Sequence, residues 1–387
     1  MASPPASPLD PALQRAFGVS RLARVTGLDR TGVEVACAVR PLGHVLQVCN
    51  GKGETFAQAA RSALSEAAEL WAAERVEPLE LEWGSYEELW ALAPGRVWHA
   101  DELGSAGEVA APALSGPRTR HAWRVATELF SGEPVRVPAQ AVHCPPPGSV
   151  SLGPAVVAWS SNGSGAHPEP EVALRHALLE AVERDQLARA LPEGWTEEEV
   201  ARRMIDPASL GDVAPSAARW RERMGANGFE LHLFDLSPEL SADPRRKRRA
   251  LDLGLPVAGA LLIDREEGPV PLTAGYGCGL SVEGALLGAL LEAAQSRLTD
   301  IHGAREDVAQ AAPEGVDRLR AACAAVRPKR KAAALPRIQE PKGVRTVLER
   351  LAGVGHDRAA AVELSPSSSG LSVVKVVVPG LRVSELL

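Results

Sequence analysis

The chain has 387 residues and a formal net charge of −7, with 45% hydrophobic and 24% charged residues. This composition is ordinary for a folded globular protein, and the acidic balance argues against a general nucleic-acid binder. No apolar run reaches the length of about eighteen residues that a membrane span needs. The five cysteines form no C-x-x-C pair, which excludes a structural zinc site of that type and favours a reduced, cytoplasmic chain without a disulfide framework.

The N-terminal part begins with a Pro- and Ser-rich segment, residues 1–12, which is predicted to be a disordered tail before a single domain over residues 13–387. Val33 to Val48 mixes β-branched residues with turn residues and predicts a hairpin that leads into the glycine loop Asn50-Gly-Lys-Gly53. Thr55 to Glu74 is rich in Ala and Leu and contains no Pro or Gly, which predicts a long helix.

The middle of the chain repeats this order. His121 to Val142 is predicted to form two strands around a turn, and Pro154 to Ser160 to form a short buried strand. A second glycine loop, Asn162-Gly-Ser-Gly165, comes next. Pro170 to Leu191 is then predicted to be another long helix.

The third part has the same order with an insertion. Phe229 to Leu236 and Val257 to Asp264 are predicted to be neighbouring strands, and the insert between them, near 240–250, carries the basic run Arg245-Arg-Lys-Arg-Arg249. A third glycine loop, Gly277-Cys-Gly279, precedes a helix predicted over Val282–His302. Later elements are predicted as a helix and loop in Gln310–Pro341, a short helix at Val344–Leu351, and strands at Ala360–Leu364 and Leu371–Val378. Repeated strand–glycine loop–helix units predict an α/β (α+β) domain.

Each of the three long helices carries two acceptor side chains three residues apart, which places both on one helix face. The pairs are Glu66 with Glu69, Glu180 with Glu183, and Glu292 with Gln295. Their nearly equal spacing along the chain suggests repeated modules around one site. Carboxylate oxygens are the ligands that Mg²⁺ prefers, usually with phosphate and water completing the coordination. The sequence therefore predicts a magnesium and nucleotide site.

Cations near the acidic pairs could bind the phosphates of a nucleotide. Arg184 follows Glu180 by one helical turn, Arg297 follows Glu292, and Lys52 lies in the first glycine loop. The alternative is that each pair is a solvated helix face and each glycine loop an ordinary turn, and for any one helix this is the simpler interpretation. Three pairs in matching contexts favour a functional site.

Taken in order, these residues resemble the YcaO proteins. The resemblance rests on Gly51-Lys-Gly53 with Ser62, Glu66 and Glu69, on Asn162-Gly163 with Glu180, Glu183, Arg184 and Asp185, and on Glu292, Gln295 and Arg297 with His302-Gly-Ala-Arg-Glu-Asp307. It extends from about Val19 to Leu381. The family has a repeated α/β arrangement around an unusual ATP site.

The resemblance implies ATP and Mg²⁺ as cofactors. It implies that the metal ligands are Glu66, Glu69, Glu180, Glu183 and Glu292. It further implies that the nucleotide is contacted by Ser62, Arg184, Gln295 and Arg297, to which Lys52 is added as a candidate from its position in the glycine loop. No catalytic residue is assigned.

Members of this family activate a backbone amide of a peptide by phosphorylating the amide oxygen, and loss of phosphate leaves an azoline, a thioamide or an amidine. Azoline-forming members typically end in Pro-x-Pro-x-Pro, whereas this sequence ends Val378-Pro-Gly-Leu-Arg-Val-Ser-Glu-Leu-Leu387. The opening, Gly18 to Gly32, resembles members that work with a TfuA partner. The resemblance therefore favours thioamide formation in ribosomally made peptide natural products (RiPP biosynthesis). An azoline-forming cyclodehydratase or an amidine-forming macrocyclase is the alternative.

The expected partners are a precursor peptide and either a TfuA-like protein or a leader-binding protein resembling ubiquitin-activating enzymes, with a homodimer as a further option. No nucleic-acid or membrane partner is expected. Two other classes remain open, namely a non-catalytic peptide-binding scaffold and an ATP hydrolase or kinase acting on a small molecule. Five clustered carboxylates argue against a scaffold, because their mutual repulsion costs stability without metal.

Overall fold

The computed structural model describes residues 7–103, 116–238, 253–266, 268–303, 313–339 and 343–382. The protein is 40% helical and 22% strand, which confirms the predicted mixture of helix and sheet. The basic run Arg245 to Arg249 lies outside the described residues. The first helix begins at Pro11, capped by the Asp10 side chain, and therefore starts before the boundary predicted at residue 13.

Three antiparallel sheets form the framework. The first has the order β1-β2-β3 and the second the order β10-β9-β8. The third has the order β4-β5-β11-β12-β7, with β6 paired to β5. The strands are β1 (Arg21–Arg24), β2 (Glu34–Val39), β3 (Val48–Gly53), β4 (Leu81–Gly84), β5 (His121–Glu128), β6 (Pro134–Pro138), β7 (Ser164–His167), β8 (Phe229–Asp235), β9 (Val257–Asp264), β10 (Leu272–Cys278), β11 (Ala360–Ser365) and β12 (Ser372–Val377).

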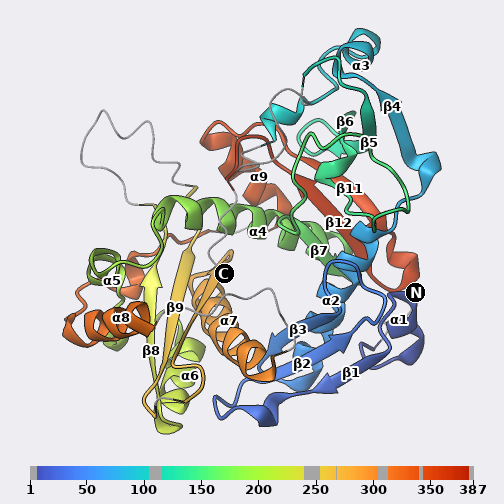
Figure 1. Ribbon diagram of the computed structural model, residues 1–387. Coiled ribbons are helices and arrows are strands. Elements are labelled where there is room, and N and C mark those ends of the chain that lie inside the picture. The colour runs from blue at the N-terminus through green and yellow to red at the C-terminus, as the bar shows by residue number, and fades with distance from the viewer. Residues whose placement is uncertain are drawn as a thin grey trace.

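Three long helices connect these sheets. They are α2 (Phe56–Glu74), α4 (Pro170–Ala190) and α7 (Val282–His302), and each packs against the strand that precedes it, β3, β7 and β10 respectively. Each also contacts a strand of another module, because α2 touches β7, α4 touches β10, and α7 touches β3. Figure 1 shows the three helices around the centre of the molecule. The modules are therefore interlocked rather than placed side by side.

The glycine segments lie within strands or directly beside their ends, which corrects the prediction that they are loops. Gly51 belongs to β3, Gly165 to β7 and Gly277 to β10. A Cβ atom on Gly51 would lie 2.0 Å from the Ala63 backbone nitrogen, and one on Gly165 would lie 2.3 Å from the Ala173 carbonyl oxygen. Glycine is needed here because the strand backbone and its helix approach too closely for any side chain.

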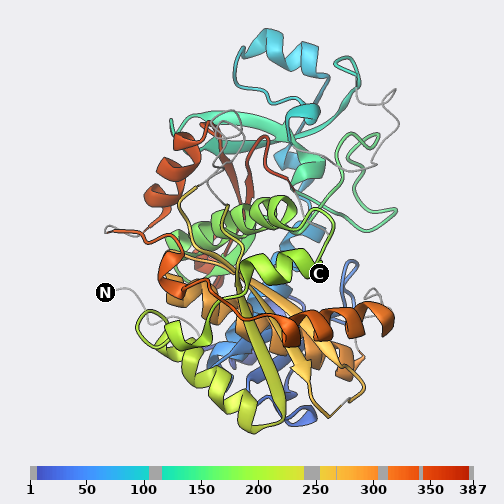
Figure 2. The same ribbon diagram turned by 90° about the vertical axis from the view of Figure 1, so that its left-hand side faces the viewer.

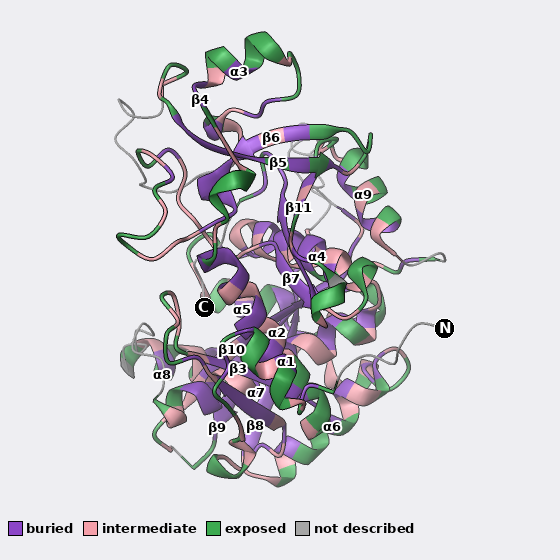
Figure 3. Cartoon of the chain, turned by 90° about the vertical axis from the view of Figure 1, so that its right-hand side faces the viewer, coloured by how far each residue is buried: buried purple, intermediate pink, exposed green. Residues whose placement is uncertain are grey.

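The two ends of the molecule are formed by different sheets. Figure 2 shows β5 and the short helix α3 (Tyr86–Leu92) at one end, and the second sheet at the other. Figure 3 shows that the strands are largely buried while α3 is exposed. The shorter α-helices are α1 (Pro11–Ala16), α3 (Tyr86–Leu92), α5 (Glu197–Arg203), α6 (Pro215–Ala226), α8 (Pro313–Ala325) and α9 (Val344–Gly353).

The strand predicted at Pro154–Ser160 is absent, since this described segment has no regular structure. None of the helices in the described ranges is long and apolar enough to cross a membrane.

Candidate functional site

The acidic pairs face a common region because small residues hold the three helices against their strands. Ala63 and Ala67 on α2 are fully buried, as are Ala177 on α4 and Ala289 and Ala293 on α7. Beside them, the five glutamates predicted as metal ligands stay half-buried. They are Glu66, Glu69, Glu180, Glu183 and Glu292. Because each helix also contacts a strand of the next module, carboxylates from different helices contribute to one another's raised pKa values.

Two of the three pairs meet around Arg184. Burial raises the pKa of Glu183 to about 7, and the charge of Glu292 on α7 contributes to that rise. Burial also raises the pKa of Glu180, although Arg184 opposes the rise. These side chains keep some solvent exposure although protein atoms surround them on most sides. The same carboxylates raise the pKa of the Arg184 guanidinium against the effect of its burial. The arrangement agrees with the predicted grouping of Arg184 with the acidic pairs.

The pair on α2 joins the same cluster. Burial raises the pKa of Glu69 well above its ordinary value, and the charges of Glu180 and Glu66 raise it further. The backbone N–H of Ala166 in β7 and the ammonium of Lys375 act in the opposite direction. Helices from three separate parts of the chain thus contribute carboxylates to one region.

Two lysines lie among these carboxylates. Lys52 Nζ donates to Glu292 Oε2 at 2.6 Å, and this contact, with Arg184, lowers the pKa of Glu292 although its burial alone would raise it. Lys375 in β12 is 4% exposed and acts on Glu69 and Glu180. Sequence analysis missed Lys375. Its signal is a single lysine inside an otherwise apolar strand, where an unpaired charge is rarely tolerated.

Ser62 and Gln295 lie beside the cluster on their helices. Ser62 is half-buried on α2, one turn before Glu66. Gln295 Nε2 donates to the carbonyl oxygen of Asn50 at 3.2 Å, which ties α7 to the first glycine segment. His176 on α4, one turn before Glu180, was also missed by sequence analysis. Desolvation of its imidazole by the surrounding protein atoms, together with the charge of Lys52, lowers its pKa, and the charge of Glu292 acts in the opposite direction.

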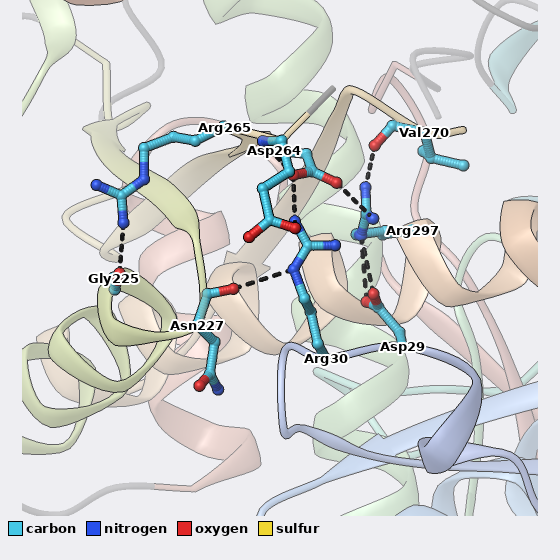
Figure 4. A network of polar contacts seen from close by, with 9 residues as sticks. Asp29, Arg30, Gly225, Asn227, Asp264, Arg265, Val270 and Arg297 are labelled. Carbon is cyan, nitrogen blue, oxygen red and sulfur yellow. Dashed lines mark hydrogen bonds and ion pairs between the residues drawn. The ribbon is translucent and has the colours of Figure 1, made fainter. Parts of the chain in front are cut away.

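Arg297 does not share this environment (Figure 4). Its guanidinium donates to both carboxylate oxygens of Asp29 at 3.2 Å, to Asp264 Oδ2 at 2.8 Å, and to the Val270 carbonyl. Arg30 also donates to Asp264, which extends the network. The side chain of Arg297 is only 3% exposed. The structure thus places Arg297 in a buried network that joins α7, β9 and the segment before β2, and the nucleotide contact expected for it stays a prediction.

The residues present fit Mg²⁺ and a nucleotide. Burial raises the pKa values of Glu69, Glu180 and Glu183, which means that the neighbouring protein cations compensate these carboxylates incompletely and a divalent cation would stabilise them. The amide oxygens of Asn50 and Asn162 are buried without a hydrogen-bond partner among the described residues. Within the same residues, no three His, Cys, Asp or Glu side chains form a metal-binding group by themselves. Magnesium usually takes one or two carboxylates, with phosphates and water as its other ligands.

Comparison with known proteins gives a consistent result. A family model described as YcaO cyclodehydratase, ATP- and Mg²⁺-binding, matches residues 50–382. An uncharacterized protein in the tfuA 3′ region of Rhizobium leguminosarum bv. trifolii is 31% identical over 389 residues, which cover 95% of this chain and 85% of that protein. The predicted cofactors, ATP and Mg²⁺, agree with the description of the matching family.

Two solved structures show the same fold. A heterocyclase in complex with substrate and cofactor has a TM-score of 0.70 at 20% identity, and the match covers 99% of this chain and 54% of that one. The structure of YcaO from Methanopyrus kandleri bound with AMPPCP and Mg²⁺ has a TM-score of 0.66 at 24% identity, and the match covers 97% of this chain and 91% of that one.

Proposed function

The chain belongs to the YcaO family of ATP- and Mg²⁺-binding enzymes, and from this premise we propose that it activates a backbone amide of a peptide by phosphorylating the amide oxygen. The observation that carries the proposal is the convergence of carboxylates from α2, α4 and α7 on one region that also holds Arg184 and Lys52. Phosphoryl transfer needs positioning and charge neutralisation more than covalent chemistry, and this set of side chains supplies both.

Each group in the site has a distinct task in this proposal. The glutamates would hold Mg²⁺, and bound Mg²⁺ would neutralise the phosphate charges of ATP. Arg184 projects a guanidinium that can bind phosphate oxygens in a bidentate manner. The hydrogen bond from Gln295 to the carbonyl oxygen of Asn50 would keep the backbone of β3 against α7. The proposed roles of the glutamates as metal ligands and of Arg184 as a phosphate contact rest on the clustering of these side chains.

Thioamide formation is the reaction we favour. A sulfide donor would add to the amide carbon, the amide oxygen would attack the γ-phosphorus of ATP, and ADP would leave. Loss of the phosphorylated oxygen as inorganic phosphate then gives the thioamide, so one sulfur replaces one oxygen and one ATP is consumed. The support comes from the relative in the tfuA 3′ region, which matches nearly the whole chain at 31% identity. This location suggests a TfuA-like partner protein that delivers the sulfide.

An azoline-forming cyclodehydratase is the second candidate. It is supported by the family description, which names a cyclodehydratase, and by the fold shared with a heterocyclase. In that reaction a Cys, Ser or Thr side chain of the peptide would be the nucleophile in place of sulfide. The same carboxylate cluster and the same phosphoryl transfer would serve both reactions.

Mass spectrometry of the peptide product separates the two reactions. The protein would be incubated with a cognate precursor peptide, ATP, Mg²⁺, sulfide and the TfuA-like partner, with omission of each component as a control. Replacement of oxygen by sulfur adds about 16 Da per site and cyclodehydration removes about 18 Da, and activation by phosphoryl transfer allows either. Loss of water would refute the thioamide assignment. An unchanged peptide and no phosphate release would refute amide activation itself.

A further inference from the structure

Two lysines bridge the acidic pairs of different helices. Lys52, in β3, is bonded to Glu292 on α7, and its charge also acts on the carboxylates of α4. Lys375, in β12, acts on Glu69 of α2 and Glu180 of α4. The chain thus places one ammonium against α7 and another in β12, a strand that packs against both α4 and α2. Each one offsets repulsion between carboxylates that approach from separate modules.

The two lysines are held very differently. Lys375 Nζ donates to the carbonyl oxygens of Ser160 and Asn162, each at 2.5 Å, and lies 5.8 Å from the centre of the Trp159 ring. The side chain is almost inaccessible to solvent. Lys52, by contrast, is 26% exposed, and its bond to Glu292 is its single side-chain hydrogen bond within the described residues.

These attachments predict different responses to a competing cation. A divalent cation that reaches Glu292 competes directly with the Lys52 ammonium, which sits on a flexible four-carbon stem and can move to a new anion. Lys375 has no such freedom. Moving its ammonium would leave the carbonyls of Ser160 and Asn162 without a partner in the interior, which costs about 1–3 kcal/mol for each unsatisfied group.

We propose that Lys52 is a displaceable counter-ion, which releases Glu292 when the metal-bound nucleotide arrives, and that Lys375 is a fixed positioning residue. Lys375 stays in place with and without the metal-bound nucleotide, and it holds the segment 160–162, which leads into β7, in the conformation that the site needs. The inference rests on the proposed ATP and Mg²⁺ site and adds the roles of two of this chain's own cations. The released Lys52 is then available to a phosphate, which reconciles its observed bond to Glu292 with the nucleotide contact predicted from the sequence.

The test compares Lys52→Met with Lys375→Met, because the same substitution should give opposite responses to Mg²⁺. Thermal unfolding would be followed in EDTA and in Mg²⁺ alone. Lys52→Met is expected to lower the melting temperature in EDTA, where Glu292 loses its partner, and Mg²⁺ is expected to restore it to the parent value. Lys375→Met is expected to lower the melting temperature in both conditions, because Mg²⁺ cannot replace the bonds to the carbonyls.

A second measurement separates positioning from mere stabilisation. Affinity for Mg²⁺ with AMPPCP would be measured by calorimetry at a temperature where circular dichroism shows each variant folded. Lys375→Met is expected to bind at least about tenfold more weakly, as with loss of a group that orients metal ligands. Lys375→Arg, which keeps the charge, is expected to recover part of that loss, and it carries the test if the methionine variant does not fold. Unchanged affinity in folded Lys375→Met, or in Lys375→Arg where the methionine variant does not fold, would overturn the positioning role.

Lys331→Met is the matched control, because Lys331 forms an exposed pair with Asp206 at 2.5 Å far along the chain from these carboxylates. The difference in melting temperature between Lys331→Met and the parent should be the same in EDTA and in Mg²⁺. If the parent binds Mg²⁺ with AMPPCP but Lys52→Met and Lys375→Met respond to Mg²⁺ alike, this inference is wrong and the proposed function stands. If the parent itself binds neither, both are wrong.

Discussion

Arg297 and Asp264 form a buried ion pair, with Arg297 Nη2 2.8 Å from Asp264 Oδ2. Both side chains are nearly inaccessible to solvent, and Asp29 forms a second ion pair with the same guanidinium. The pair joins the last half of α7 to the end of β9. Removal of either partner therefore leaves a charge in the interior, which is far more costly than loss of a surface ion pair.

Arg297→Met is expected to lower the free energy of unfolding by about 3–5 kcal/mol, because Asp29 and Asp264 lose their shared cation. Asp264→Asn should also destabilise the protein, since the guanidinium loses a charged partner. Neither variant should change the affinity of the folded protein for Mg²⁺ with AMPPCP. Chemical denaturation and calorimetry measure the two quantities. A loss of affinity in Arg297→Met alone would instead support the nucleotide contact predicted from the sequence.

Removing the charge of a proposed metal ligand should weaken nucleotide binding without unfolding the protein. Glu180→Gln and Glu292→Gln are each expected to reduce the affinity for Mg²⁺ with AMPPCP at least about tenfold, because Mg²⁺ binds carboxylate oxygens far better than amide oxygens. Glu171→Gln, at an exposed position in the first turn of α4, is the matched control. Equal affinity in all three variants and the parent, measured by calorimetry, would show that these glutamates are not ligands.

His143 should make the protein less stable in mild acid. Burial, with the nearby charge of Arg124, lowers the pKa of its imidazole from 6.5 to about 4, and neither ring nitrogen has a hydrogen-bond partner within the described residues. As the pH falls, His143 is protonated in the unfolded chain before it is protonated in the folded protein. Its contribution to the free energy of unfolding is therefore fully present above about pH 6.5 and is lost progressively down to about pH 4. The loss is on the order of 3 kcal/mol.

Replacement of His143 by Phe should remove this part of the pH dependence, because the ring can no longer be protonated. Urea unfolding of the parent and of His143→Phe between pH 7 and about 4 measures it. His44→Gln is the control, since that side chain is exposed. Parallel pH profiles for His143→Phe and the parent would contradict the assignment to His143.

Glycine in β3 should be irreplaceable for packing. Gly51→Ala places a Cβ 2.0 Å from the Ala63 nitrogen and 2.3 Å from the Ala59 carbonyl oxygen, so strand and helix must separate. A loss of about 3 kcal/mol or more in unfolding free energy is expected, as for severe overpacking. Gly27→Ala, where no atom lies within 4 Å of the added carbon, should have little effect. Similar melting temperatures for the two variants would show that the backbone of β3 can adjust.

Much of the local structure follows from the sequence, because helix propensity and apolar periodicity are local properties. The helix predicted at Val282–His302 has the bounds of α7, and the strands predicted at Phe229–Leu236 and Val257–Asp264 pair as β8 and β9. The helix predicted from Thr55 begins one residue later, with Thr55 as its capping residue. The pairings of β12 with β7 and of β11 with β5 were not predictable, because they join segments that lie far apart in the chain.

The candidate site was likewise predictable in its local features and not in its long-range contacts. Residue type and spacing identified the acidic pairs, and the structure brings all three helices that carry them together. They could not identify the buried partners Asp29 and Asp264 of Arg297, which belong to other elements. Nor did they identify Lys375, since a strand prediction counts its apolar neighbours and does not show which loop carbonyls will meet its ammonium.

The interlocked modules have a consequence for how the protein is made. The carboxylates of α2 and α4 leave the ribosome long before α7 and before β12, which pairs with β7 and carries Lys375. A growing chain therefore holds the acidic helices α2 and α4 without Lys375 and without the strand β12 that pairs with β7. The complete cluster forms only after β12, the last strand among the described residues, has been synthesised and paired with β7. A chain interrupted before β12 is then expected to be an acidic, incompletely paired fragment rather than a protein with a weakened site.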